Sequence, residues 1–184
     1  MSETTVRLMR SDEFTAMREV CVAAFEGDVK IGPLLDALRA SWSWEDELSF
    51  VAVRDGSIVG QVLYNHAFLD APASLVDVLL LSPVGVRPDV QNQGIGSRLI
   101  TESLAALRAR PEPLIFLEGH PTYYPRFGFR PGASLGFSAP SVRIPPAALM
   151  VHPLPAYEPW MTGALVYPDA FWRTDTVGLR EEVA

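Results

Sequence analysis

The sequence predicts an α+β fold, in which helices flank a mixed and mostly antiparallel central sheet. Three observations support this fold class. The dipeptide Asp55-Gly56 lies between two strand-like runs, as expected for a two-residue hairpin turn in which both positions adopt positive φ. A central strand at 74–86, with its longest apolar run near 78–81, is followed after a short loop by a helical pattern. The wholly apolar run at 114–117 has the composition of a buried parallel strand.

The elements of the first half follow from the spacing of apolar residues. A strand at 6–9 precedes a helix that Ser11 or Asp12 can cap. The predicted apolar face of this helix consists of Phe14, Met17, Cys21, Ala24 and Phe25. A second helix is indicated by Leu34, Leu35, Leu38 and Trp42. The hairpin strands are expected at 48–53 and 58–69.

The second half contains a helix and a proline-rich region. The helix that follows the central strand has one apolar face, formed by Ile95, Leu99, Leu104 and Leu107. Arg108 and Arg110 complement the dipole at its C-terminus, and Pro111 ends it. Twelve of the sixteen prolines lie between Pro111 and Pro168, which predicts loops and short edge strands. Two of these strands are expected near 148–152 and 164–167.

The composition fits one globular domain. With 184 residues, 48% hydrophobic and 20% charged, the chain can bury a sizeable core. We expect a single domain over residues 1–171 and a peripheral tail at 172–184. The one cysteine, Cys21, excludes an internal disulfide, and its place on an apolar helix face predicts a buried structural thiol.

Charge and hydropathy restrict the partners and the location. The formal net charge of −7, without a basic patch, argues against nucleic acid as a partner. The chain shows neither a hydrophobic leader nor an apolar run of the ~20 residues needed to span a bilayer, so we expect a cytoplasmic protein without a membrane partner. An anionic ligand would have to rely on local backbone N–H groups and on nearby cations such as Arg87 or Arg98.

The most informative stretch follows the central strand. Residues Gln91 to Gly96 read Q-x-x-G-x-G and lead into a helix that no side chain caps. The first backbone N–H groups of a helix lack internal acceptors and carry the positive end of the dipole, so glycines there let a pyrophosphate approach. Ser97 and Arg98 follow where a Walker loop needs Lys and Ser/Thr, and Leu99 occupies the third glycine of a dinucleotide fingerprint. Both of those phosphate loops are therefore excluded.

The loop instead resembles the coenzyme A loop of the GNAT superfamily of acyl-CoA-dependent N-acyltransferases. About thirty residues later, Gly119 to Phe129 read G-H-P-T-Y-Y-P-R-F-G-F, similar to the family's Tyr-x-x-x-Gly-Phe pattern, with Tyr124 on the tyrosine. This string and G-A-L-V-Y-P-D-A-F at Gly163 to Phe171 most resemble the bacterial YhbS-like branch. The resemblance covers about Val6 to Phe171.

The central strand carries a proline and a glycine near its end. Pro83 removes one donor from the sheet and Gly85 is typical of a bulge, so we expect the sheet to split there. An ordinary strand end is the alternative. The resemblance implies that the splayed parallel pair admits the pantetheine arm and that the loop binds the pyrophosphate of acetyl-CoA. The implied coenzyme contacts are Val84, Gly85, Val86, Gln91, Asn92, Gln93, Gly94, Ile95, Gly96 and Ser97.

The chemistry that the resemblance implies is direct attack of a primary amine on the acetyl thioester, without a metal. Tyr124 is the predicted general acid for the departing thiolate, because a phenol keeps its proton at neutral pH. Relatives with a glutamate on the central strand place it where Leu80 stands here, so the base is open between Asp77, Glu118 and His120, or a chain of water molecules. His120 and Glu118 are our tentative choices.

Two other functions remain open from the sequence. The chain could be a non-catalytic acyl-CoA-binding or sensing module, or an interaction protein without a cofactor. The amine acceptor, whether a small molecule or a protein amino group, is not written in the sequence. The oligomeric state, a homodimer included, is not written there either.

Overall fold

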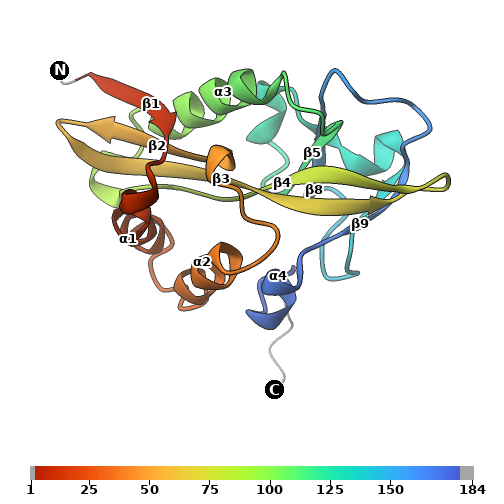
Figure 1. Ribbon diagram of the computed structural model, residues 1–184, viewed down its shortest axis with the longest axis horizontal. Coiled ribbons are helices and arrows are strands. Elements are labelled where there is room, and N and C mark those ends of the chain that lie inside the picture. The colour runs from red at the N-terminus through yellow and green to blue at the C-terminus, as the bar shows by residue number, and fades with distance from the viewer. Residues whose placement is uncertain (1–2, 179–184) are drawn as a thin grey trace. The chain divides into compact units, whose positions relative to one another are not determined.

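The central sheet runs in the order β1-β2-β3-β4-β5-β8-β6, with β9 paired to both β3 and β7, in the computed structural model of the protein (Figure 1). The structure describes residues 3–178. Its strands are Thr4–Leu8 (β1), Ser49–Arg54 (β2), Ser57–Asp70 (β3), Leu75–Val86 (β4), Leu114–Glu118 (β5), Arg130–Pro131 (β6), Phe137–Ser138 (β7), Leu149–Pro153 (β8) and Gly163–Val166 (β9). Its α-helices are Phe14–Ala24 (α1), Ile31–Arg39 (α2), Ile95–Leu107 (α3) and Asp169–Arg173 (α4).

The sheet is mixed, as the sequence predicted. β1, β2 and β3 pair antiparallel, as do β5 and β8, whereas β4 and β5 pair in parallel at Leu79↔Ile115 and Leu80↔Phe116. The predicted hairpin is confirmed, because Asp55 and Gly56 have φ values of +51° and +76° between β2 and β3. None of the helices within residues 3–178 is long and apolar enough to cross a membrane.

The chain forms two units that share strands β3 and β4. The first unit holds residues up to 65 together with 81–109, and the second holds 66–80 together with 110 onward. The single domain predicted for 1–171 stays a prediction. Of the predicted tail, residues 179–184 lie outside the described residues. In the part that is described, Val177 is fully buried and the Gly178 N–H donates to the Glu118 carboxylate at 3.3 Å.

In the first unit, α1 and α3 cover opposite faces of the sheet. A Cβ added to Gly60 of β3 would lie 3.0 Å from the Leu99 side chain of α3. On the other face, a Cβ added to Gly85 of β4 would lie 2.9 Å from the Ala24 Cβ of α1. Gly85 therefore lets α1 approach the strand closely, a packing role that the sequence did not reveal.

Cys21 faces the same interface from α1. Its side chain is fully buried, and its sulfur accepts a hydrogen bond from Gln61 Nε2 at 3.0 Å. Burial raises the pKa of the thiol to about 12, and the Gln61 hydrogen bond opposes this only in part. The thiol therefore stays protonated and packed, as predicted.

Two sequence-based expectations about helix ends were wrong. Neither Ser11 nor Asp12 caps α1: a 3-10 turn, Ser11–Glu13, precedes that helix, and the Glu13 carboxylate accepts the Arg10 N–H at 2.9 Å. Trp42 lies beyond the end of α2 and is 52% exposed. The Arg110 guanidinium donates two hydrogen bonds to Glu112, at 2.8 and 2.9 Å, and its role at the C-terminus of α3 stays a prediction.

The contact at Gly85 gives a stability prediction. Gly85→Ala should lower the free energy of unfolding by ~1–3 kcal/mol, because the new methyl group overpacks the interface with α1. The double variant Gly85→Ala/Ala24→Gly removes the opposing Cβ and should recover most of that loss. Urea denaturation of the two single variants, the double variant and the wild type measures the coupling. Additive losses would contradict the packing role.

Candidate functional site

Helix α3 begins without a side-chain cap. Its N-cap residue, Gly94, has φ +80°, and the first backbone hydrogen bond of the helix runs from Arg98 N to Gly94 O at 3.0 Å. No acceptor among the described residues bonds the N–H groups of Gln93, Gly94, Ile95 or Gly96. These donors lie together at the positive end of the helix dipole, which makes the turn suited to an anion.

The turn is held by contacts with the end of strand β4. Gln91 Nε2 donates to the Val86 carbonyl at 3.0 Å, and the Arg87 N–H donates to the Val59 carbonyl at 2.9 Å. Asn92 adopts φ +60°, a conformation that asparagine tolerates better than most residues. The first glutamine of the Q-x-x-G-x-G motif therefore holds the loop in place through its side chain.

Two arginines line a pocket at this turn. The cavity, of about 360 Å³, is lined by Glu3, Thr4, Arg54, Gln93, Gly94, Ile95 and Arg98. Arg54 donates to Gln93 Oε1 at 2.7 Å, and Arg98 donates to the Thr4 carbonyl and pairs with Glu102 at 2.5 Å. The sequence predicted Arg98 but missed Arg54, which the β2–β3 hairpin brings to the loop from 39 positions away. Its other candidate, Arg87, pairs with Asp89 at 2.6 Å.

The end of β4 has the features of an interrupted strand. Among the described residues, its parallel register with β5 stops at Leu80, before the proline at position 83. The side-chain amide of Asn65 donates to the Ser82 carbonyl at 2.6 Å, while its own Oδ1 is buried without a hydrogen-bond partner in the described structure. Leu80, where the resemblance would place a glutamate, is 1% exposed. At this position the strand therefore offers backbone groups rather than a side-chain base.

In the second unit, Tyr124 opens a short 3-10 helix, Tyr124–Phe127. Its ring makes edge contacts with Tyr123 and Phe129, with centroids 5.1 and 5.8 Å apart. A Cβ on Gly119 would lie 2.4 Å from Tyr124 Cε2, so the ring rests on the backbone of Gly119. Burial, together with the neighbouring Tyr123, raises the pKa of Tyr124 to about 12. Its hydroxyl makes no hydrogen bond to any residue that the structure describes.

The two tentative bases differ in their surroundings. Glu118 ends β5, and burial raises the pKa of its carboxyl group, while the Gly178 N–H and Arg143 act in the opposite direction. His120 is exposed, and its Nδ1 shares a hydrogen bond of 3.0 Å with Thr122 Oγ1. Asp77, the third candidate, lies near the start of β4 and is also exposed. Glu118 is thus the half-buried member of the three.

The predicted site residues fall into two groups by unit. Residues 84–97 belong to the first unit, where they form the end of β4 and the start of α3. Glu118, His120 and Tyr124 belong to the second unit, at the end of β5 and in the turn that follows. Within each group the residues lie close together in the sequence, so a strand end and the turn that follows it bring them together.

Known proteins share this fold and sequence pattern. Residues 5–132 match the model of the acetyltransferase (GNAT) domain family. The chain is 34% identical over 137 residues to the uncharacterized N-acetyltransferase YjhQ of Escherichia coli K12, covering 74% of this chain and 75% of that protein.

Solved structures agree with that match. A GNAT family acetyltransferase from Brucella melitensis, in complex with acetyl-CoA, has a TM-score of 0.72 at 29% identity and covers 92% of this chain and 98% of its own. The N-acetyltransferase YhbS from Escherichia coli, in complex with CoA, has a TM-score of 0.82 at 23% identity and covers 94% of both chains, a likeness of fold. The chain therefore belongs to the GNAT family and is an acyl-CoA-dependent acetyltransferase, as its two motifs predicted.

Proposed function

We propose that this enzyme transfers the acetyl group of acetyl-CoA to a primary amine of a small molecule or a protein, by direct attack of the amine on the thioester. The start of α3 carries this proposal. Four successive N–H groups have no acceptor among residues 3–178, and the helix starts at a left-handed glycine without a side-chain cap. These features suit a diphosphate site of the kind that the Q-x-x-G-x-G motif implies.

The coenzyme would be held by backbone donors and two cations. The N–H groups at 93–96 bind the pyrophosphate, and Arg54 and Arg98 supply positive charge in a protein whose net charge is −7. The backbone of Val84, Gly85 and Val86 pairs with the pantetheine amides as a short extra strand would. This arrangement requires no side-chain base from β4, in keeping with the leucine at position 80.

In the reaction, the amine nitrogen bonds to the carbonyl carbon and the carbon–sulfur bond breaks, giving an amide and CoA. We assign to Tyr124 the role of interacting with the sulfur of the departing CoA. With a pKa of about 12 it stays a neutral phenol, but it is a weaker acid than an ordinary thiol of pKa ~8.5. It therefore stabilises the departing thiolate by donating a hydrogen bond, and full protonation of the sulfur follows from solvent.

Glu118 is the base that the surroundings favour. A carboxylate whose pKa is raised by burial accepts a proton from an ammonium group more readily than an exposed one. His120 remains the second candidate, exposed to solvent at the turn before Tyr124. Glu118→Gln and His120→Gln, compared over a pH series, distinguish the two, because only the variant of the true base loses the rising limb of kcat against pH.

The direct test is CoA release over a panel of primary amines. Turnover with one or more amines supports the enzyme. Tight acetyl-CoA binding without turnover on any amine would support a sensing module instead, and the absence of binding would overturn both.

The diphosphate site predicts a matched pair of glycine variants. Gly94→Ala should weaken acetyl-CoA binding about tenfold or more in calorimetry, because alanine disfavours φ +80° by ~1–2 kcal/mol and displaces the helix start. Gly56→Ala is the control: its φ is +76° and, as at Gly94, a Cβ there meets nothing within 4 Å. It should cost similar stability and leave the affinity unchanged. Equal affinities for the two variants would contradict the site.

Tyr124 is tested through kcat. Tyr124→Phe should lower kcat by about 10²-fold, the usual effect of removing one donor to developing charge, with little change in acetyl-CoA affinity. Tyr123→Phe, next to it in the same aromatic cluster, should change kcat little. Because the pKa of Tyr124 is about 12, its ionisation should add no loss of rate below about pH 11. A wild-type kcat for the Tyr124→Phe variant would contradict the proposed hydrogen bond from Tyr124 to the thiolate.

Gly119 positions the tyrosine ring. Gly119→Ala should reduce kcat while acetyl-CoA still binds, since the added methyl group would overlap Tyr124 and displace its ring. Gly132→Ala serves as the control, because its Cβ would meet Leu149, with side-chain atoms at 3.1 and 3.2 Å and the carbonyl oxygen at 3.4 Å, and would not meet Tyr124. In the Tyr124→Phe background the Gly119 substitution should reduce kcat far less. Full additivity of the two losses would refute the positioning role.

A further inference from the structure

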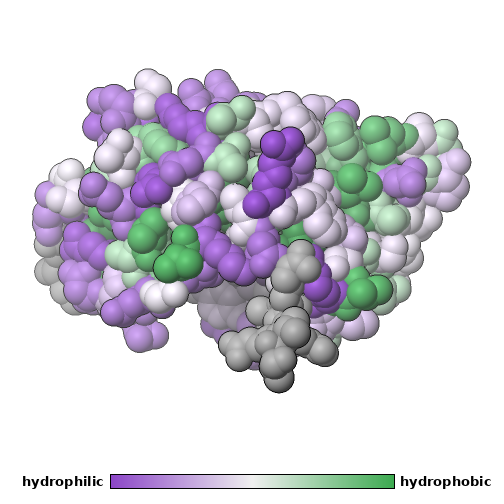
Figure 2. Space-filling model, turned by 90° about the horizontal axis from the view of Figure 1, so that it is seen from below, coloured by the Kyte–Doolittle hydropathy of each residue, from purple (hydrophilic) through white to green (hydrophobic). Residues whose placement is uncertain are grey.

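The second unit contains a pocket that the proposed acetyl transfer does not use. Its volume is about 600 Å³, within the range of small-molecule sites. All of its lining residues belong to the second unit: His66, Ser74, Leu75, Val76, Asp77, Pro111, Glu112, Pro113, Ala156, Trp160 and Met161. Figure 2 shows several apolar side chains, in green, on the right of the view, the side on which Figure 1 draws the turn between β3 and β4.

The pocket is remote from Tyr124 within its own unit. Pro113 lines it just before β5 begins, whereas the ring of Tyr124 rests on Gly119 just after β5 ends. Six residues of extended chain span about 20 Å. The pocket is therefore a second site rather than the place where Tyr124 acts.

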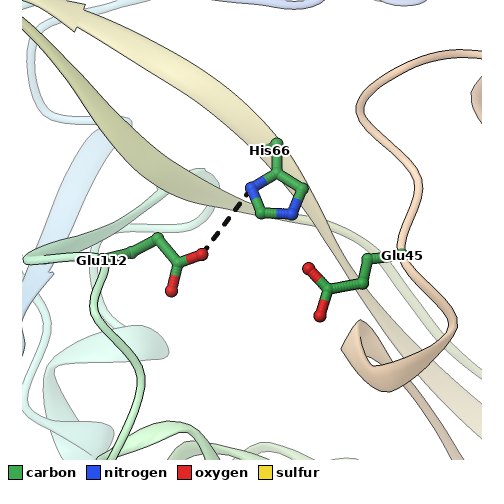
Figure 3. A group of neighbouring side chains, drawn as sticks. All are labelled: Glu45, His66 and Glu112. Atoms are coloured by element: carbon green, nitrogen blue, oxygen red, sulfur yellow. Dashed lines mark ion pairs between the residues drawn. The ribbon is translucent and has the colours of Figure 1, made fainter.

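One wall of the pocket carries a neutralised ion pair. Arg110 donates two hydrogen bonds to Glu112, and His66 Nδ1 lies 3.7 Å from Glu112 Oε1, as Figure 3 shows for the histidine and the glutamate. Although burial opposes it, the hydrogen bonds from Arg110 lower the pKa of Glu112, so this carboxylate stays ionised. The arginine balances the charge of this carboxylate.

The remaining charge of the lining is negative. The exposed carboxylate of Asp77 makes no hydrogen bond or ion pair with any described residue, and none of the lining residues is a lysine or arginine. A ligand with a positive charge would therefore meet an unpaired anion, whereas an anionic ligand would meet repulsion.

The lining also has an aromatic and apolar part, which includes the exposed indole ring of Trp160. Trp160 is 40% exposed, and its Nε1 donates to Glu158 Oε2 at 2.9 Å, which fixes the edge of the ring. Leu75, which is 59% exposed, and Met161 add apolar surface to the same cavity. Aromatic rings bind organic cations through their negative faces, and the apolar residues suit the rest of such a molecule.

We propose that this pocket binds a small organic cation, an ammonium compound with an apolar body, between Asp77 and Trp160. The site does not depend on acetyl transfer. It differs from the acceptor site in that its ligand need not carry a nitrogen that can be acetylated.

Benzyltrimethylammonium is a suitable probe, because a quaternary nitrogen cannot be acetylated. We expect saturable binding in calorimetry and a change in tryptophan fluorescence, in the presence or absence of acetyl-CoA. Its uncharged isostere, neopentylbenzene, should bind at least about tenfold more weakly, since it keeps the shape and loses the charge. Equal affinity of the two compounds, or no binding of the charged one, would overturn the proposal.

Variants assign the binding to this pocket. Asp77→Asn and Trp160→Leu should each weaken probe binding by about three- to tenfold. Trp172→Leu is the matched control, because Trp172 is 41% exposed and lies on α4 outside the pocket lining. Binding that all three variants leave intact would place the probe elsewhere and refute the site. The result is independent of the amine panel, so a failure of acetyl transfer and a failure of this pocket are distinguishable.

Discussion

The proposed coenzyme site depends on the backbone N–H groups at the start of α3, which have no hydrogen-bond acceptors among the described residues. A helix that opens with Gly94 in the left-handed conformation exposes several N–H groups at once, and no side chain of the described structure takes them. Elsewhere such groups would be capped by serine, threonine or aspartate, at a gain of ~1 kcal/mol. Here no such cap is present among the described residues, and in the proposed function a bound diphosphate would supply the missing acceptors.

Much of the fold was predictable because short-range sequence patterns determine its turns, strands and helices. The Asp55-Gly56 turn fixes the β2–β3 hairpin, and the apolar runs fix β4, α3 and β5 within a residue or two. Strands β8 and β9 were also placed correctly from short apolar runs among prolines. The errors arose at helix ends, where the Glu13 carboxylate bonds the Arg10 N–H in place of a Ser11 or Asp12 cap, and where α2 ends at Arg39, before Trp42.

The candidate site could be proposed from the sequence only where its residues are consecutive. The loop at 91–97 and the turn around Tyr124 are short motifs, which can be recognised from the sequence because their residues are consecutive. Arg54 was missed because its approach to Gln93 depends on the hairpin and not on any nearby sequence signal. The role of Gly119 could not be predicted from the sequence either. Glycine at this position leaves room for the ring of Tyr124, five positions later, which a Cβ atom would overlap in the folded protein. Asp77 and Trp160 likewise share a pocket that no spacing rule predicts.

The hydrogen bond from Gly178 to Glu118 has a practical consequence for work with this enzyme. Val177, buried beside that donor, anchors the end of the described chain. Shortening the chain before this valine would remove both the anchor and the donor. Since the donated hydrogen bond favours the ionised carboxylate, its loss would make Glu118 less acidic. An enzyme trimmed for crystallisation could therefore show a shifted pH optimum even though no residue assigned to the chemistry had been changed.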